Sequence, residues 1–134
     1  MKYMLTLIGE EQGGMDDMTP EQMAEMMEPW NEYNRQLLEA GAFVAGEGLH
    51  PSSSATTIRV AENGTDQTVT DGPFAETKEQ LGGFYLIECA DLDEALEWAK
   101  KVPVRPGSAV EVRPAMDFTE LGYTDPYAEA AKTS

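Results

Sequence analysis

The chain has 134 residues, of which 41% are hydrophobic, which is typical of one globular domain with its own core. Its net charge of −16 argues against nucleic acid and anionic membranes as partners, because both would repel the chain. No segment has the apolar length of a membrane span, and residues 1–11 lack the cleavage pattern of a signal peptide, so we expect a cytoplasmic protein.

The first half of the chain predicts a strand followed by a helix. Residues 2–8 are largely apolar on both sides, which is typical of a central strand covered on both faces. Thr19 and Pro20 fit the N-cap and first position of a helix that ends at Gly41, with Pro29 predicting a kink or split near Glu28. The predicted buried face of this helix consists of Met23, Met26, Met27, Trp30, Tyr33, Leu37 and Leu38.

The second half predicts a hairpin, two strands and a second helix. After a short strand at residues 42–50, residues 56–70 form a hairpin around Asn63-Gly64, the pair preferred in type I′ turns. This turn places Ile58 opposite Val69 and Val60 opposite Gln67. A strand at 82–89, a helix capped by Asp91 and ended by Pro103, and a strand at 108–114 follow.

The predicted element order gives the fold class. Without the hairpin it is βαββαβ, the ferredoxin-like α+β arrangement, over a domain of residues 1–116 with a polar tail at 117–134. Two helices cover one face of such a sheet, yet residues 3–8 and 84–89 are apolar on both sides. We therefore predict a homodimer in which a second copy covers the helix-free face.

Cysteine and histidine each occur once. Cys89 lies in an apolar strand, where a buried, inert thiol is the ordinary interpretation. His50 follows a predicted strand. One cysteine and one histidine cannot supply the ligands of the common zinc, iron or copper sites, so we expect no tightly bound transition metal and no cofactor.

The segments "VTDGPFAETKEQLGGFYLIE", "DEALEWAKKVP" and "VEVRP" carry a family resemblance. They resemble the DGPF branch of the YCII-related proteins, from Lys2 to about Pro114 and most specifically at Asp71-Gly72-Pro73-Phe74. The resemblance implies a bacterial protein that dimerises as an α/β barrel. It also implies a regulatory link, because genes of this branch often neighbour those of extracytoplasmic-function sigma factors. The wider family carries a His-Asp pair proposed for acid–base chemistry, and His50 does not match that motif.

The DGPF turn and the charges after it form the first candidate site. Asp71 either accepts backbone hydrogen bonds in the turn, with Gly72 extended before Pro73, or acts as a general base. Phe74 is either a hydrophobic anchor or the wall of a site for a flat ligand.

Three charged residues follow this turn. Glu76 and Glu79 share one side of a predicted helical turn ended by Gly82, where they form a solvated cluster or move a proton. Lys78 points elsewhere, and its functional role would be to hold an anionic substrate.

Glu111 and Arg113 form the second candidate site. Val110 and Val112 suit the helix-covered face, which puts Glu111 and Arg113 on the face that a dimer would close over. Buried charges need partners, so the two residues either form a structural ion pair or Arg113 binds a carboxylate or enolate with its planar fork of donors.

Both candidate sites are predicted to converge at one end of the sheet, in a cleft suited to a small polar or anionic molecule. One function class is therefore a small-molecule-binding domain with acid–base lyase or isomerase activity. The other is a non-catalytic regulatory partner, such as a partner of a sigma factor, whose acidic surface meets a basic one. An oxygenase, as among other dimeric α/β barrels, is disfavoured because the sequence offers no haem or iron ligand set.

Overall fold

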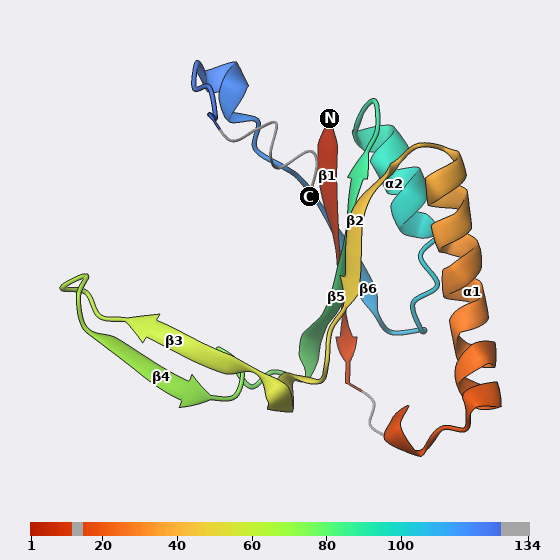
Figure 1. Cartoon of the computed structure of the whole chain (residues 1–134), viewed down its shortest axis with the longest axis horizontal. Coiled ribbons are helices and arrows are strands. Elements are labelled where there is room, and N and C mark those ends of the chain that lie inside the picture. Colours follow the sequence, from red (N-terminus) through yellow and green to blue (C-terminus); the bar gives the residue numbers. More distant parts are fainter. Residues whose placement is uncertain (12–14, 127–134) are drawn as a thin grey trace.

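The computed structural model describes residues 1–11 and 15–126 as a four-stranded sheet with two helices on one face and a separate hairpin (Figure 1). The strands are β1 (Lys2–Glu10), β2 (Phe43–Gly48), β3 (Thr56–Val60), β4 (Gln67–Asp71), β5 (Glu79–Glu88) and β6 (Ala109–Pro114). The helices are α1 (Pro20–Glu39) and α2 (Leu92–Lys100), with short 3-10 helices at Met15–Asp17, Ser52–Ser54 and Phe118–Leu121.

The main sheet has the strand order β2-β5-β1-β6, and each neighbouring pair is antiparallel. With the β3–β4 hairpin set aside, this is the βαββαβ order of a ferredoxin-like sheet. The predicted α+β class with an inserted hairpin is therefore confirmed. The homodimer and its α/β barrel stay predictions, since a single chain is described.

Helix α1 begins and ends as its sequence predicts. Thr19 and Gln22 form a reciprocal capping box at its start. At its end Gly41 has φ 69°, and the backbone N–H of Ala42 donates to Leu37 O at 2.9 Å, as in a Schellman motif.

The predicted split at Pro29 is wrong, because α1 runs through it without interruption. Pro29 and Glu25 both lie on the exposed side of the helix, where water can satisfy the carbonyl group that proline leaves unpaired. The three methionines at positions 23, 26 and 27 are partly buried, as predicted. Leu38 is 62% exposed, contrary to the prediction, because the buried stripe of α1 runs through its neighbour Leu37.

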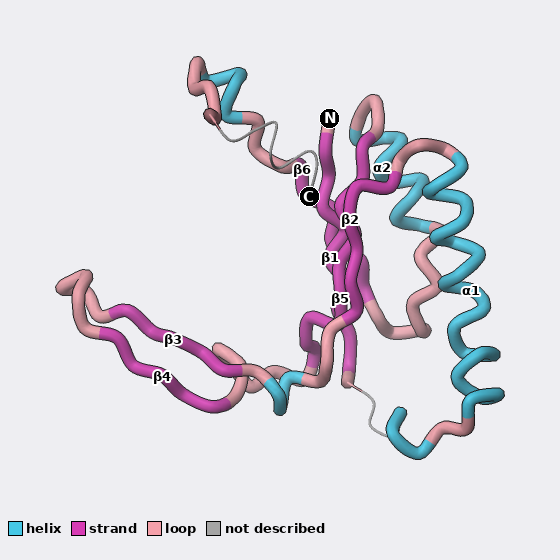
Figure 2. The backbone as a smooth tube through the Cα atoms, viewed as in Figure 1, coloured by secondary structure: helices cyan, strands magenta, loops and turns pink. Residues whose placement is uncertain are grey.

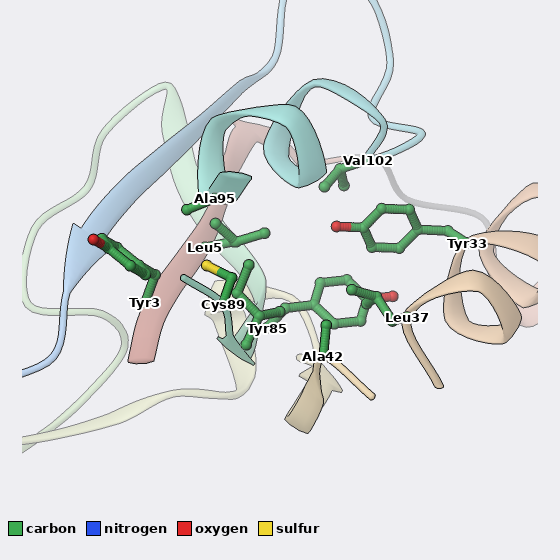
Figure 3. Close-up of a cluster of buried hydrophobic side chains, with 10 residues drawn as sticks. Tyr3, Leu5, Tyr33, Leu37, Ala42, Tyr85, Cys89, Ala95 and Val102 are labelled. Atoms are coloured by element: carbon green, nitrogen blue, oxygen red, sulfur yellow. The ribbon is translucent and has the colours of Figure 1, made fainter. Parts of the chain in front are cut away.

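The core lies between the sheet and the two helices (Figure 3). Its buried side chains are Tyr3, Leu5, Tyr33, Leu37, Ala42, Tyr85, Ile87, Cys89, Ala95 and Val102. Tyr33 stands edge-on to Tyr85, with ring centroids 5.2 Å apart, and its hydroxyl donates to Trp98 O at 2.9 Å. One aromatic side chain thereby joins α1 to the sheet and to α2, and burial raises the pKa of its hydroxyl.

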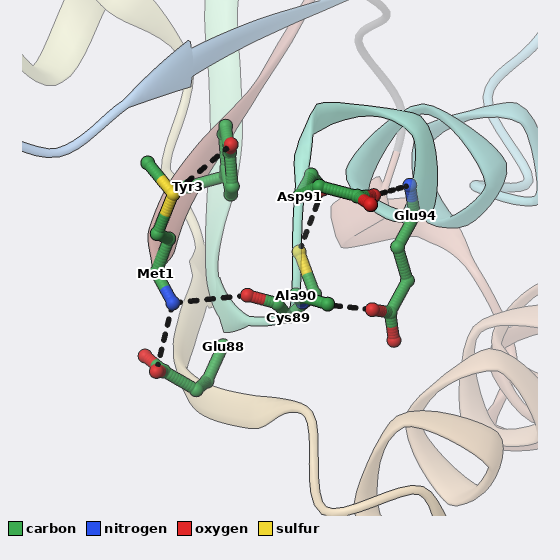
Figure 4. A network of polar contacts seen from close by, with 7 residues as sticks. All are labelled: Met1, Tyr3, Glu88, Cys89, Ala90, Asp91 and Glu94. Atoms are coloured by element: carbon green, nitrogen blue, oxygen red, sulfur yellow. Dashed lines mark hydrogen bonds and ion pairs between the residues drawn. The ribbon is translucent and has the colours of Figure 1, made fainter.

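Polar contacts fix the passage from β5 to α2 around Cys89 (Figure 4). The backbone N–H of Cys89 donates to Met1 O at 2.9 Å, and the Met1 α-amino group donates to Cys89 O at 2.9 Å. Asp91 caps α2 by accepting from Glu94 N at 2.9 Å, as predicted. The Cys89 thiol is buried, also as predicted, and burial is the main cause that raises its pKa.

The opposite face of the sheet has no helix over it (Figure 1). The register places Thr6 between Phe84 and Glu111 across this face. Thr6 and Phe84 are half-buried, and Glu111 is exposed. In the single chain, this mixed apolar and polar surface is open to a binding partner.

The β3–β4 hairpin has the predicted register but not the predicted turn. Ile58 pairs with Val69, as expected. A type I′ turn needs positive φ at both central residues, whereas among the described residues only glycines have positive φ, and Asn63 is therefore excluded. The Asn63 side chain instead accepts from the backbone of Thr65 and Asp66, both at 3.0 Å, and this contact stabilises a wider loop.

The chain beyond β6 leaves the sheet on the side away from the helices, as the hairpin does (Figure 2). Asp117 accepts from Thr119 N at 3.0 Å and so caps the 3-10 helix at Phe118–Leu121. The predicted tail is thus partly ordered up to residue 126, and its remainder lies outside the described residues. Within the described ranges, no helix combines the length and apolarity that a bilayer crossing requires.

Candidate functional site

An open pocket of about 600 Å³ lies where β1 ends, β5 begins and the chain approaches β6. Its lining residues are Glu10, Lys78, Glu79, Arg105, Pro106, Gly107 and Ser108. The loop before β6 is a tight turn, in which Ser108 N donates to Arg105 O at 3.0 Å and Gly107 has φ 89°. The pocket is therefore formed by two strand ends and one tight turn.

Charges of both signs line this pocket. Glu10 and Glu79 are directly opposite each other in the β1–β5 ladder, an arrangement that repels unless cations are near. Lys78 Nζ lies 2.9 Å from Glu10 Oε1, and Arg105 donates to Glu10 O at 3.1 Å. Lys78 and Glu10 are both exposed, so water screens their ion pair and an incoming anion can compete for the lysine.

The turn packs closely against β1 at Gly9. A Cβ atom on Gly9 would lie 2.6 Å from Ser108 Oγ. The Arg105–Ser108 turn therefore lies directly beside the end of β1.

Two of the pocket residues, Lys78 and Glu79, were predicted from the sequence, whereas Glu10 and Arg105 were missed. The available signal for Glu10 was its position at the end of the first strand. Because adjacent antiparallel strands share an end of the sheet, the end of β1 had to meet the beginning of β5. No comparable signal marks Arg105, whose position depends on the loop conformation.

The DGPF turn anchors the hairpin and does not line the pocket. Thr57 Oγ1 donates to Gly72 O at 2.7 Å, and the Arg59 guanidinium lies 4.5 Å from the centroid of the Phe74 ring. Arg59 also donates to Phe74 O at 2.9 Å. Phe74 is exposed and contacts Arg59, so it serves as an anchor for this arginine and does not line the pocket. Asp71 is exposed at the end of β4.

Two local predictions around this turn are wrong. Gly72 is not extended but has φ 106°, a conformation that other residues rarely adopt. The predicted helical turn over residues 76–79 is absent, because Glu79 already belongs to β5. The Gln80 side chain donates to Ala75 O and Thr77 O, both at 3.1 Å, and holds this loop in a non-helical turn. Glu76 is exposed and does not line the pocket.

Glu111 and Arg113 lie on the helix-free face, as predicted, and form an ion pair of 2.7 Å. Their side chains are 46% and 74% exposed, respectively. Glu111 is opposite Thr6, four residues along β1 from Glu10. The expected convergence of all candidates in one cleft is therefore wrong in the single chain, because the β1–β6 register separates this pair from the pocket and the hairpin base.

Metal ligands are not assembled in the described part of the chain. No three side chains of His, Cys, Asp or Glu come together there in a way that could hold a metal ion. His50 is exposed in the loop after β2.

Comparison with known proteins identifies the family. The sequence model of the YCII-related domain matches residues 1–119, a range that contains all the strands and both α-helices. An uncharacterized protein of Rhizobium meliloti (strain 1021) is 49% identical over 82 residues, which cover 60% of this chain and 64% of that protein. The match over most of the chain agrees with the resemblance carried by the DGPF turn and the flanking strands. The chain belongs to the family of proteins with a YCII-related domain.

Proposed function

We propose that the chain binds a small anionic molecule in the open pocket at the end of β1. The observation that carries this proposal is the meeting of two cations and two carboxylates there, Lys78 and Arg105 with Glu10 and Glu79. Arg105 offers a planar set of donors and Lys78 a mobile point charge, which together suit a carboxylate or phosphate group. The exposure of the pocket suits a ligand that exchanges freely with water.

The same arrangement supports acid–base chemistry of the lyase or isomerase type. Glu79 would move a proton while a cation holds the anionic group of the substrate, since a carboxylate within hydrogen-bond reach of a bound substrate can act as a general base. Glu10 stands opposite Glu79 and is the second candidate for this role. Asp71 and Glu76, predicted as catalytic from the sequence, would need a ligand or second copy that extends beyond the pocket lining.

The proposed working form is a homodimer that closes over the helix-free face. The half-buried Thr6 and Phe84 on this face support it, as does the lack of a covering helix. In that form the Glu111–Arg113 pair would be covered by the second copy. Arg113 then either neutralises Glu111 or presents its donors to a ligand between the copies.

A regulatory role is the alternative, and the charge of the helical layer favours it. Helix α1 carries five glutamates and one arginine. Such a surface can attract a basic partner, for which an extracytoplasmic-function sigma factor is the candidate suggested by the family resemblance. Titration of a purified sigma factor with this chain at low and high salt tests this alternative, and absence of salt-sensitive binding would contradict it.

The pocket is tested with anions of defined chemistry. Acetate, succinate and phosphate are added to isotope-labelled protein, and amide NMR shifts are followed at residues 9–11, 78–80, 105, 107 and 108. We expect at least one anion to shift these amides in the wild type and much less in Lys78→Met. Lys100→Met is the matched control, since Lys100 is another exposed lysine paired with a glutamate, Glu97, at 3.2 Å. Equal responses in all three proteins, or no response in the wild type, would contradict the proposal.

A further inference from the structure

The β3–β4 hairpin stands apart from the main sheet as an arm of two strands (Figure 2). It is held at its base, where Gly72 N donates to Ala55 O at 2.7 Å and Arg59 stacks on Phe74. Beyond this base, nine of its ten strand residues are exposed. The arm therefore has a fixed origin and very little cover from its own chain.

One face of this arm carries its aliphatic side chains, with Gln67 at one end of that face and the Thr56–Asp71 pair at the other. Ile58, Val60 and Val69 lie on the same face and are 60%, 57% and 66% exposed. The opposite face carries Arg59 and threonines. An isolated two-stranded hairpin is at best marginally stable in water, and aliphatic side chains gathered on one exposed face mark an interaction surface.

Charge indicates what can approach this face. The two strands of the arm carry one arginine and one aspartate, Arg59 and Asp71. The loop that joins them adds Glu62 and Asp66. The helices are more acidic, with five glutamates against one arginine in α1 and three acidic residues against one lysine in α2. Since the arm leaves the sheet on the side away from these helices, a second copy that meets the arm does not have to approach the acidic helical layer (Figure 1).

We propose that the apolar face of the β3–β4 arm packs against a second copy of this chain. The proposal rests on the homodimer proposed above and adds a surface that the four-stranded sheet does not provide. The arm projects from the same side as the helix-free face, so a copy that covers this face lies beside the arm. In a two-fold dimer the contact is made twice, with each copy supplying one arm. The Arg59–Phe74 contact at the base of the hairpin then helps to orient the arm toward the second copy.

Two lysine substitutions on β4 test this contact. Val69→Lys places a charge on the apolar face, and Thr70→Lys places the same charge on the adjacent, exposed residue of the other face. Sedimentation equilibrium gives the dimer dissociation constant of each protein. We expect Val69→Lys to raise this constant by about tenfold or more, and Thr70→Lys to change it by less than about threefold.

Hydrogen exchange of the wild type supplies a second measurement that needs no variant. The backbone amides of β3 and β4 should become more protected as protein concentration rises through the dissociation constant. If the wild type forms a stable dimer but the amides of the arm stay unprotected, or if both variants have the same dimer dissociation constant, the arm contact is wrong and the proposed dimer is not affected. A wild type that stays monomeric up to NMR concentrations would overturn both. Near-UV circular dichroism identifies any variant whose four-stranded domain has unfolded. In that case, hydrogen exchange of the wild type decides whether the arm contacts the second copy.

Discussion

Replacement of Arg113 by methionine tests whether the helix-free face is exposed to water or covered by a second copy. In the single chain the Arg113–Glu111 pair is largely exposed, at 74% and 46%. Exposed pairs contribute at most about 1 kcal/mol, so the variant should change the unfolding free energy of the monomer by no more than that. If a second copy covers the pair, the substitution leaves Glu111 buried without its partner, which costs roughly 3–5 kcal/mol.

The assay measures the two quantities separately. Urea unfolding at dilute concentration gives the stability of the monomer, and sedimentation equilibrium gives the dimer dissociation constant. We expect the first to change by less than about 1 kcal/mol in Arg113→Met and the second to rise by about 100-fold, equivalent to about 3 kcal/mol. Methionine keeps much of the apolar stem of the arginine, so the lost charge and its donors dominate the effect.

A double variant, Glu111→Met with Arg113→Met, supplies the control. Dimerisation should recover because no unpaired charge remains. If Arg113 also binds a ligand anion, anion binding will stay lost in the double variant. An unchanged dissociation constant in Arg113→Met would refute the burial of this pair in a dimer, and a loss of several kcal/mol in the dilute monomer would refute the assignment of the pair to an exposed surface.

Three further predictions concern the core and the ionisable groups. Leu37→Ala should lower the unfolding free energy, measured in urea titrations, by about 2–5 kcal/mol because Leu37 is fully buried. Leu38→Ala should lower it by about 0.5 kcal/mol or less. Equal losses would contradict the observation that α1 buries Leu37 and exposes Leu38. Hydrogen bonds from Arg35 are the main cause that lowers the pKa of Glu32 to about 2. The stability that this carboxylate contributes is therefore present above pH 4.5 and is lost toward pH 2. Arg35→Met should raise the pKa of Glu32 in an NMR titration, and an unchanged pKa would argue against the Arg35–Glu32 pair. The Cys89 thiol, whose pKa is raised mainly by burial, should react slowly with Ellman's reagent until urea unfolds the chain, and fast reaction of the folded protein would contradict its burial.

The sequence predicted the fold because its signals are local. Thr19, Pro20 and Gly41 mark the ends of α1 through hydrogen bonds within a few residues, and Asp91 does the same for α2. Apolar residues on both sides of residues 3–8 and 84–89 mark the two central strands, β1 and β5. Element order then leaves few arrangements of the sheet.

Two of the local errors share a cause, which is a side-chain hydrogen bond that competes with a regular backbone pattern. Asn63 binds the backbone of Thr65 and Asp66 and replaces the expected type I′ turn. Gln80 binds two backbone carbonyls and replaces the expected helical turn before β5. Neither contact follows from residue type alone, because each requires the neighbouring backbone to present its polar groups.

The sequence by itself determined the ferredoxin-like order, the family and the types of residue available for chemistry. Only the tertiary structure decided which charges meet. It joined Lys78 and Glu79 to Glu10 and Arg105, kept Phe74 with Arg59, and left the Glu111–Arg113 pair separate. The physical reason is register: a strand's sequence predicts its faces, whereas the residue opposite each position depends on bulges, such as that between Leu7 and Ile8, and on turn conformations that arise when the whole sheet packs.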